Sequence, residues 1–323
     1  MIGGKKMKGI HCFSTRPMLQ GRDISGYGKD KFSILEFPDY MLATMLLSAQ
    51  QWRKTNGPIT LYTDKVFYEH LEHKGVLDFW DDVNCNLEDI DKIFPEIDHA
   101  VFWSAAKFYC YMIEKAPFVC VDTDLIVWKP IIADSQNCDL MFTHWESIED
   151  GDTNYIPKEN LEVSSSYEFL SNYNKVKKGL NMSMTAFLTE DFKNLFTKEA
   201  IKFMHHSSKR FDNRYATPEI LYMEQILPIQ LAIKGNYKLK PLINCTWSPK
   251  QFRFIQQDKN EWIFNSFNPE QLCMHLWFHK NYIEKNLEAR KEYMDSIRLV
   301  FERNFPNKIQ AFEKAISNSK LPV

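Results

Sequence analysis

The feature that most constrains the fold is an uninterrupted apolar run that ends in two carboxylates. Residues 118–121 read Phe-Val-Cys-Val, Asp122 and Asp124 come next, and residues 125–128 are apolar again. A short apolar run without polar alternation is typical of a strand buried on both faces, as in parallel sheets covered by helices. The run therefore predicts an α/β fold and places two acids at the end of a central strand.

The first 125 residues alternate between strand-like and helix-like segments. Strands are predicted at 9–15, 59–62, near 83 and at 118–121, and helices at 39–52, 65–73 and 100–115. Further strands are predicted at 138–143, 181–188, 236–242 and 271–277, and further helices at 190–206, 217–234, 280–303 and 307–317. This order predicts a mixed, mostly parallel sheet flanked by helices, whose ligand site lies beyond the carboxyl ends of its strands.

The chain of 323 residues contains no Pro-, Gly- or Ser-rich linker and no internal repeat. We therefore expect a single domain over residues 1–323. A polar stretch at about 146–178 separates two apolar runs and is expected to form an inserted flap, because long excursions in compact domains are often lids. The residues from about 281 to 323 are expected to form a helical tail.

Composition excludes several classes of protein. The 40 basic and 42 acidic residues give a net charge of −2, which argues against a nucleic-acid partner. The 11 glycines include neither a G-x-x-x-x-G-K-[ST] nor a G-x-G-x-x-G motif, which excludes phosphate sites built on those glycine loops. The sequence shows no signal peptide or membrane-spanning run, and its seven cysteines are irregularly spaced. We expect a cytoplasmic protein with reduced thiols; peripheral membrane contact and oligomeric state stay open.

Two carboxylates at the edge of a core are costly unless a cation neutralises them. Mg²⁺ and Mn²⁺ are typically held by one or two carboxylates together with substrate phosphates. The pattern therefore predicts that Asp122 and Asp124 bind a divalent metal; alternatively, they cap a turn or pair with Lys129. The two other Asp-x-Asp triplets, at 89–91 and 150–152, lie in polar surroundings and are expected to be solvated.

Residues 103–111 and 117–130 resemble the donor-site segment of GT-A-fold glycosyltransferases. They are most similar to bacterial and fungal families of retaining enzymes that use nucleotide sugars. The resemblance implies a GT-A-like, Rossmann-type fold in which Asp124 coordinates the metal that bridges the donor diphosphate. Asp122 would contact the metal, the ribose or the donor sugar. Lys107 stands where the family often has Arg and would reach the phosphates or the sugar; alternatively, it is a surface lysine.

The same resemblance implies a third metal ligand near the C-terminus. His275 lies in the apolar run 272–277 and matches, in chain order, the histidine that often completes the metal site. Alternatively, it is a core histidine. Lys280 is placed to meet the diphosphate, although the glycine between His and Lys in the family motif and the Pro-Trp after it are absent.

The resemblance also implies that the loop after the first strand, which contains Phe13, Ser14 and Arg16, holds the base and the ribose, partly through backbone groups, and that Arg16 pairs with phosphate. Tyr62 and Asp64 end the second strand, where the family often places residues near the base. An aromatic ring can stack on the base, and a carboxylate can accept hydrogen bonds from the base or the ribose. Alternatively, Arg16 lies on the surface, Tyr62 caps the sheet and Asp64 caps the next helix.

Glu224 lies in a predicted helix that carries an acidic residue near the acceptor in similar enzymes. Its neighbours Met223 and Ile226 suggest burial, which would raise its pKa and let it orient or deprotonate an acceptor hydroxyl. Alternatively, it is an exposed helix residue. Glu224 and Asp122 are thus the candidate catalytic residues.

We therefore expect a hexosyltransferase-like, retaining enzyme that depends on Mn²⁺ or Mg²⁺. It would move a sugar from a nucleoside-diphosphate sugar to a glycan or another hydroxyl acceptor, in surface polysaccharide or glycan synthesis. One alternative is a phosphatase of the haloacid-dehalogenase type, although Ile126 stands where that pattern has Thr or Val. The other is a non-catalytic carbohydrate-binding protein.

Overall fold

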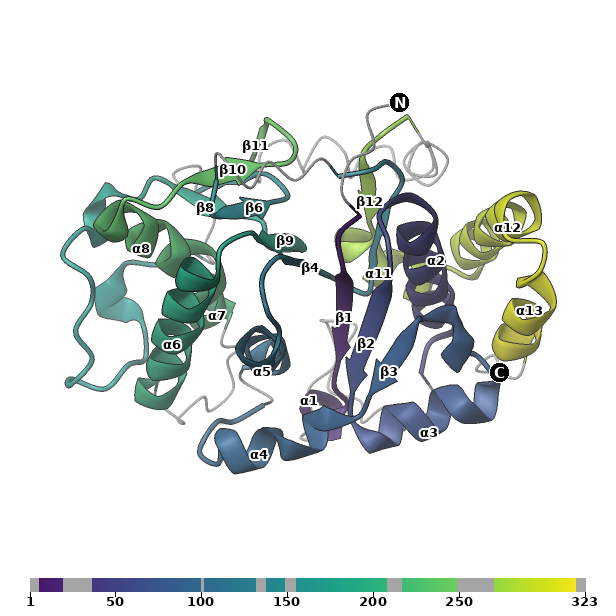
Figure 1. Ribbon diagram of the computed structural model, residues 1–323, viewed down its shortest axis with the longest axis horizontal. Coiled ribbons are helices and arrows are strands. Elements are labelled where there is room, and N and C mark those ends of the chain that lie inside the picture. Colours follow the sequence, from purple (N-terminus) through teal and green to yellow (C-terminus); the bar gives the residue numbers. More distant parts are fainter. Residues whose placement is uncertain are drawn as a thin grey trace. The chain divides into compact units, whose positions relative to one another are not determined.

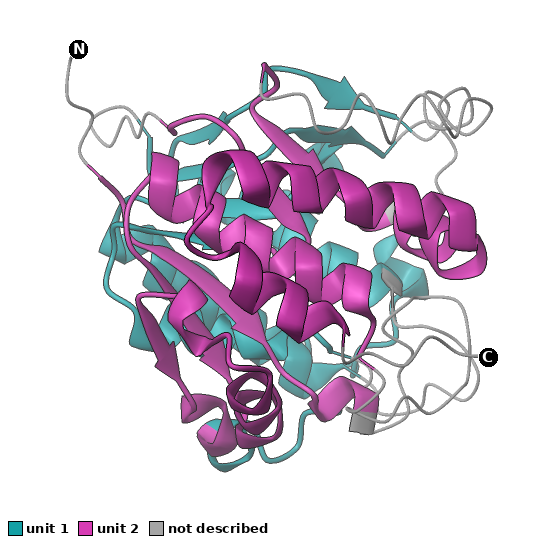
Figure 2. Ribbon diagram, turned by 90° about the vertical axis from the view of Figure 1, so that its right-hand side faces the viewer, with its two compact units in different colours: residues 1–5, 90–120, 132–257 teal, residues 6–89, 121–131, 258–323 magenta. Residues whose placement is uncertain are grey.

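The computed structural model describes residues 6–19, 37–99, 102–131, 138–148, 155–207, 217–248 and 270–317. The chain divides into two compact units, and each is assembled from segments far apart in the sequence (Figure 2). Unit 1 comprises residues 1–5, 90–120 and 132–257, and unit 2 comprises residues 6–89, 121–131 and 258–323. The single domain expected over the whole chain stays a prediction.

Unit 2 contains parallel strands in the order β1-β2-β3 and an antiparallel pair, β5 with β12 (Figure 1). Its strands are β1 (Gly9–Phe13), β2 (Ile59–Thr63), β3 (Asp82–Asn84), β5 (Leu125–Val127) and β12 (Cys273–His275). Its α-helices are α1 (Arg16–Leu19), α2 (Asp39–Thr55), α3 (Lys65–Lys74), α11 (Lys280–Lys285), α12 (Leu287–Asn304) and α13 (Ile309–Ser317). Its 3-10 turns are η2 (Leu77–Phe79), η3 (Asn86–Asp89) and η7 (Trp277–His279).

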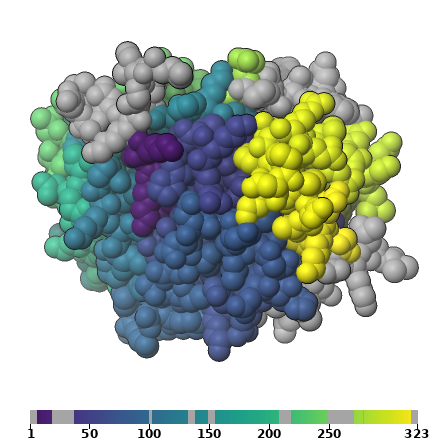
Figure 3. Space-filling model, turned by 45° about the vertical axis from the view of Figure 1, so that its right-hand side comes forward, coloured from purple at the N-terminus to yellow at the C-terminus, as the bar shows by residue number. Residues whose placement is uncertain are grey.

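The long helix α2 is the core element of unit 2. Residues 40–52 of this helix are all buried, including Trp52, because β5, α12 and α13 all pack against it. The helix begins after Pro38 and stops before Gly57, which has a positive φ of 143°. Figure 3 shows the C-terminal helices, in yellow, lying against the blue N-terminal segments. The expected C-terminal tail is therefore helical through residue 317; residues 318–323 lie outside the described part.

Unit 1 contains strands in the order β10-β6-β9-β4 and a three-stranded sheet in the order β11-β7-β8. Its strands are β4 (Phe118–Val121), whose last residue belongs to unit 2, β6 (Leu140–Phe142), β7 (Trp145–Ser147), β8 (Lys178–Leu180), β9 (Met184–Phe187), β10 (Leu239–Pro241) and β11 (Thr246–Trp247). Its helices are α4 (Ile90–Ile93), α5 (Ala105–Ile113), α6 (Glu190–His206), α7 (Thr217–Leu221), the π-helix η6 (Tyr222–Ile226) and α8 (Leu227–Gly235), with 3-10 turns η4 (Lys158–Asn160) and η5 (Tyr173–Lys175).

The predicted α/β class with mixed, mostly parallel pairing is confirmed. Strands β1, β2 and β3 pair in parallel, as do β10 with β6 and β11 with β7, whereas β6 pairs antiparallel with β9. All four residues of β4 are buried, as the apolar run at 118–121 predicts. None of the helices in the described ranges is both long enough and apolar enough to cross a membrane.

Two predicted helices are interrupted, each for a local reason. The helix expected at 217–234 contains the π-helix η6 immediately before Pro228. A proline ring clashes with the carbonyl four residues earlier, here that of Glu224, and a π turn accommodates this clash. The helix expected at 280–303 breaks at Asn286, whose side chain accepts a 3.0 Å hydrogen bond from the Ala289 amide and so caps α12.

The polar stretch at 146–178 starts and ends on a pair of strands. Strand β7 pairs antiparallel with β8, and Glu146 lies opposite Gly179. The excursion between them contains the turns η4 and η5, and its residues 149–154 lie outside the described part. The movement of this stretch as a lid stays a prediction.

Candidate functional site

A tight turn at the start of β5 presents the two carboxylates of the Asp-x-Asp motif. The Leu125 amide donates a 3.0 Å hydrogen bond to the Asp122 carbonyl, which closes the turn. The antiparallel ladder of β5 with β12 places His275 opposite Leu125, and the Leu276 amide donates a 3.0 Å hydrogen bond to the Asp124 carbonyl. Backbone pairing alone therefore brings a histidine 151 residues after Asp124 in sequence beside the motif.

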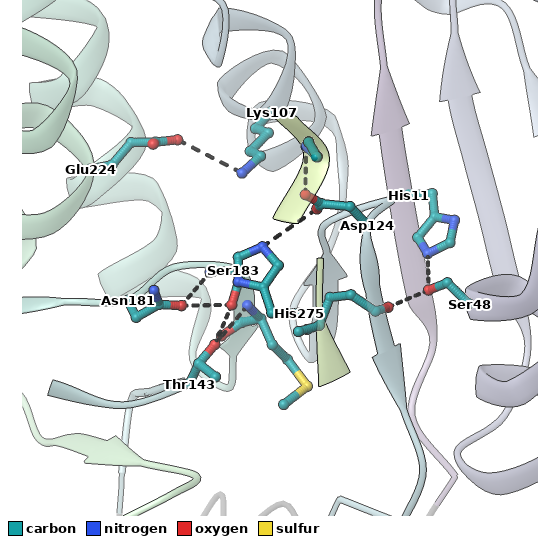
Figure 4. A network of polar contacts seen from close by, with 12 residues as sticks. His11, Ser48, Lys107, Asp124, Thr143, Asn181, Ser183, Glu224 and His275 are labelled. Atoms are coloured by element: carbon teal, nitrogen blue, oxygen red, sulfur yellow. Dashed lines mark hydrogen bonds and ion pairs between the residues drawn. The ribbon is translucent and has the colours of Figure 1, made fainter. Parts of the chain in front are cut away.

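Asp122, Asp124 and His275 form a compact group of potential metal ligands within unit 2. One ligand atom from each lies within 4.8 Å of the others. The His275 Nε2 atom is 3.5 Å from Asp124 Oδ1, and Figure 4 shows the ring pointing toward that carboxylate. Two carboxylate oxygens and an imidazole nitrogen are a donor set that suits Mn²⁺ and also tolerates Mg²⁺ or Zn²⁺.

Asp124 is held in its charged form by its neighbours. The Lys280 Nζ atom lies 2.6 Å from Asp124 Oδ2. Burial is the largest single influence on this carboxyl and would raise its pKa, but the Lys280 ammonium and the His275 ring together hold the pKa well below its usual value. A carboxylate that is ionised across the physiological range is ready to bind a cation.

The observed contacts decide some of the alternatives. The Lys129 ammonium lies 3.5 Å from the carboxylate of Glu270, an acid outside the motif. In the triplet at 89–91, the Asp91 side chain is 62% exposed, as expected for an acid at the surface, and lies 3.4 Å from His99 Nε2. The triplet at 150–152 lies outside the described residues.

Lys107 and Glu224 face each other within unit 1 (Figure 4). Lys107 lies on α5 and Glu224 on the π-helix η6, and their charged atoms are 3.9 Å apart. Both side chains are mostly buried, with 19% and 14% of their surface exposed. Neither is thus a fully solvated surface residue. Single π turns inside α-helices occur frequently at functional sites.

The residues expected to hold the base serve the framework of unit 2. Asp64 is 2% exposed and caps α3 through the Phe67 amide at 3.1 Å, as the alternative interpretation predicts. It also accepts hydrogen bonds from the Ser14 hydroxyl at 3.0 Å and the Thr15 amide at 2.5 Å. These bonds tie the loop after β1 to the end of β2. A contact of Asp64 with a nucleotide stays a prediction.

The other residues around this loop also have partners in the protein. The Phe13 ring packs on Phe67 with centroids 4.2 Å apart. Arg16 donates to the Glu88 carbonyl at 3.3 Å and lies 3.8 Å from its carboxylate. Tyr62 is buried at the end of β2. Their roles at a base or a phosphate stay predictions.

A buried polar cluster in unit 1 was not expected as such from the sequence. Glu146 is 4% exposed and accepts hydrogen bonds from the Tyr155 hydroxyl and the Asn181 side-chain amide, both at 2.6 Å. The Ser183 hydroxyl donates to Asn181 at 2.6 Å and lies 2.9 Å from the Thr143 hydroxyl. The sequence does contain an indication of such a cluster, because the strand predicted at 181–188 contains polar residues, and polar groups buried in a sheet need hydrogen-bond partners.

One protein family matches the sequence, over residues 27–314. The chain belongs to this family. It is described as a family of unknown function, DUF6734. Among curated proteins, none matches the sequence.

Several solved structures resemble the chain distantly. The glycosyltransferase GlyE of Streptococcus pneumoniae TIGR4 is 10% identical with a TM-score of 0.41, over 92% of this chain and 64% of that one. The PaToxG glycosyltransferase is 8% identical with a TM-score of 0.36, over 97% and 86% of the two chains. The inositol-1-phosphate CTP transferase of T. maritima is 11% identical with a TM-score of 0.35, over 76% and 87%. Likenesses at this level carry no argument about activity.

Proposed function

We propose that this protein is a metal-dependent glycosyltransferase that transfers a sugar from a nucleoside-diphosphate sugar to a hydroxyl acceptor. The observation that carries the proposal is the group Asp122, Asp124 and His275 at the end of a buried strand. A bound Mn²⁺ or Mg²⁺ would supply electrostatic stabilisation of the diphosphate leaving group. The hexosyl donor, the retaining outcome and a role in glycan synthesis rest on the resemblance of residues 103–130.

The protein groups have distinct tasks in this proposal. Asp122, Asp124 and His275 would hold the cation, and Lys280, released from Asp124, would be available to the diphosphate. This exchange is reasonable because Lys280 now occupies the place of a counter-ion, 2.6 Å from Asp124. Lysine is a mobile point charge on a flexible stem and suits phosphate.

Glu224 is the candidate for orienting or deprotonating the acceptor hydroxyl. Its carboxylate lies 3.9 Å from the Lys107 ammonium, and both are mostly buried. A glutamate to glutamine change would keep the shape and remove the charge. We expect Glu224→Gln to lower turnover by about 100-fold, the lower end of general acid–base effects, with unchanged Mn²⁺ affinity.

Ligand-dependent thermal stabilisation tests the proposal. A ligand that binds only the folded state at 100 times its Kd stabilises it by about 2.7 kcal/mol. Nucleoside diphosphates and nucleotide sugars should raise the Tm when Mn²⁺ is present and not in EDTA, and Asp124→Ala should abolish this shift. An equal shift in Asp124→Ala would overturn the proposal. Phosphate release from a simple phosphoester that is lost in Asp122→Asn would favour the phosphatase instead.

A further inference from the structure

A chain of buried hydrogen bonds runs through unit 2 to the turn that carries the metal ligands. The Trp80 Nε1 atom lies 3.2 Å from His11 Nδ1, and His11 Nε2 lies 3.1 Å from the Ser48 hydroxyl. The Ser48 hydroxyl donates a 2.5 Å hydrogen bond to the Leu125 carbonyl. Leu125 directly follows Asp124, and Figure 4 shows His11 and Ser48 pointing toward each other.

The chemistry of these side chains fixes which atom donates and which accepts in each hydrogen bond of this chain. The indole N–H of Trp80 can only donate, so His11 Nδ1 must accept and the ring proton lies on Nε2. The ring then donates to Ser48, whose own proton goes to the Leu125 carbonyl. His11 is completely buried, and this burial lowers its pKa to about 3 against a smaller opposing effect of Asp124. The ring is therefore neutral from mildly acidic to basic pH, and the chain keeps its direction.

Helix α2 holds both ends of β5. Ser48 binds the carbonyl of Leu125 at the first residue of the strand, and Gln51 Nε2 binds the carbonyl of Trp128, just after its last residue, at 3.2 Å. Ser48 and Gln51 are three residues apart, so they lie on the same face of the helix. Ser48 bonds the residue next to Asp124, whereas Gln51 bonds a residue beyond the other end of the strand. Loss of Ser48 should therefore disturb the metal ligands more than loss of Gln51.

We propose that Ser48, oriented by His11, is a positioning residue of the metal centre. It fixes the peptide that follows Asp124, so that the turn presents its carboxylates to the cation in one geometry. Two backbone amides help to hold the turn, through hydrogen bonds from Leu125 to Asp122 and from Leu276 to Asp124. The hydrogen bond from the Ser48 side chain is one that a point substitution can remove. This inference rests on the proposed metal site.

Thr44 provides a matched control on the same helix. Its hydroxyl is completely buried one turn before Ser48, and it bonds the Tyr40 carbonyl and the Tyr293 hydroxyl, each at 2.6 Å. Neither partner belongs to β5 or β12. Thr44→Val therefore removes a buried hydroxyl whose hydrogen bonds go to neither β5 nor β12.

The test is the equilibrium affinity of the full chain for Mn²⁺ alone, measured from the electron paramagnetic resonance signal of free Mn²⁺. Loss of an outer partner of a metal ligand typically weakens metal binding about 10- to 100-fold. We expect Ser48→Ala to weaken Mn²⁺ binding at least tenfold, Gln51→Leu to weaken it less, and Ser48→Thr to restore it. Thr44→Val should lower the Tm and leave the affinity unchanged.

The outcomes separate the two proposals. Wild-type affinity in Ser48→Ala, together with lost binding in Asp124→Ala, overturns the positioning role and leaves the metal site intact. Equal weakening in Ser48→Ala and Thr44→Val also overturns it, because the effect is then one of general stability. Unchanged Mn²⁺ binding in Asp124→Ala overturns the metal site itself.

Discussion

Two mostly buried carboxyl groups, one in each unit, have different kinds of partners. Asp124 in unit 2 lies beside cationic or ionisable partners, with Lys280 at 2.6 Å and His275 at 3.5 Å. Glu146 in unit 1 accepts hydrogen bonds from neutral groups, the Tyr155 hydroxyl and the Asn181 amide. A divalent cation can replace a lysine ammonium, whereas it cannot replace neutral donors without leaving them unsatisfied. The comparison supports the proposed cation binding at Asp124 and a framework role for Glu146.

The largest expected effect is on Mn²⁺ binding. Asp124→Ala removes one of three proposed ligands and should weaken Mn²⁺ binding at least about 100-fold. Loss of a residue that merely hydrogen-bonds a metal ligand already weakens binding by up to about 100-fold. Glu146→Gln should leave the affinity unchanged. Titration of both variants with Mn²⁺ checks this, with circular dichroism as the control for folding. Equal losses of Mn²⁺ affinity in the two variants would contradict the different roles proposed for Asp124 and Glu146.

Stability should respond in the opposite order. Glu146→Ala leaves the Asn181 side-chain amide without its acceptor, whereas the Tyr155 hydroxyl keeps its contact with Gln225; an unsatisfied buried donor costs about 1–3 kcal/mol. We expect a lower urea midpoint with wild-type Mn²⁺ affinity. Urea unfolding followed by tryptophan fluorescence measures the midpoint. A Glu146→Ala variant as stable as the wild type would show that the cluster does not support unit 1.

Acid should weaken unit 2 more than the Glu146 cluster. Burial lowers the pKa of His11 and of His279 to about 3. The unfolded chain then binds protons that the folded chain does not, so stability falls as the pH drops from about 6.5 toward 3 and is unaffected above 6.5. These two groups, together with His70, whose pKa burial lowers to about 4, contribute up to about 4.1 kcal/mol per pH unit.

Hydrogen exchange between pH 7 and pH 5 measures this difference by segment. After correction for intrinsic exchange rates, protection in β1 and α11 should fall more than protection in β7 and β8. The corresponding control is His11→Gln, which should reduce the pH dependence in β1. Equal changes in all four elements would contradict the assignment of the acid effect to these histidines.

The smallest expected effect concerns Lys280. Because its ammonium competes with the cation for Asp124, Lys280→Met should strengthen binding of Mn²⁺ alone by about fivefold, the equivalent of about 1 kcal/mol of ion-pair energy. Binding of a nucleoside diphosphate with Mn²⁺ should weaken, since a phosphate partner is lost. Calorimetric titrations with and without the nucleotide separate the two effects. Weaker binding of Mn²⁺ alone would mean that Lys280 supports the metal site.

Much of the fold could be predicted because local patterns agree with the packing. The apolar run at 118–121 forms a fully buried strand, and the helix expected at 190–206 has the observed bounds. The break at Asn286 had a signal, since Asn is a favoured helix cap. The π-helix before Pro228 was harder to foresee, because a proline more often ends or kinks a helix.

The site was predictable only in part. The Asp-x-Asp motif stands out because its carboxylates interrupt an apolar segment, but His275 was suggested by family resemblance and is placed by strand pairing. The sequence does not mark Ser48 and His11 as parts of a site, since Ser48 lies in a buried helix and His11 in the buried part of a strand. Ser48 donates to a backbone carbonyl 77 residues away, and His11 bonds Ser48 and Trp80; such contacts depend on tertiary packing.

Pulsed electron paramagnetic resonance of the Mn²⁺-loaded protein tests the central claim most directly. A histidine nitrogen bound to Mn²⁺ gives a resolved ¹⁴N coupling. The proposed site predicts one such coupling, which His275→Gln abolishes and His205→Gln, on exposed helix surface, preserves. A coupling that persists in His275→Gln, or none in the wild type, would contradict the assignment of Asp122, Asp124 and His275 as the metal centre.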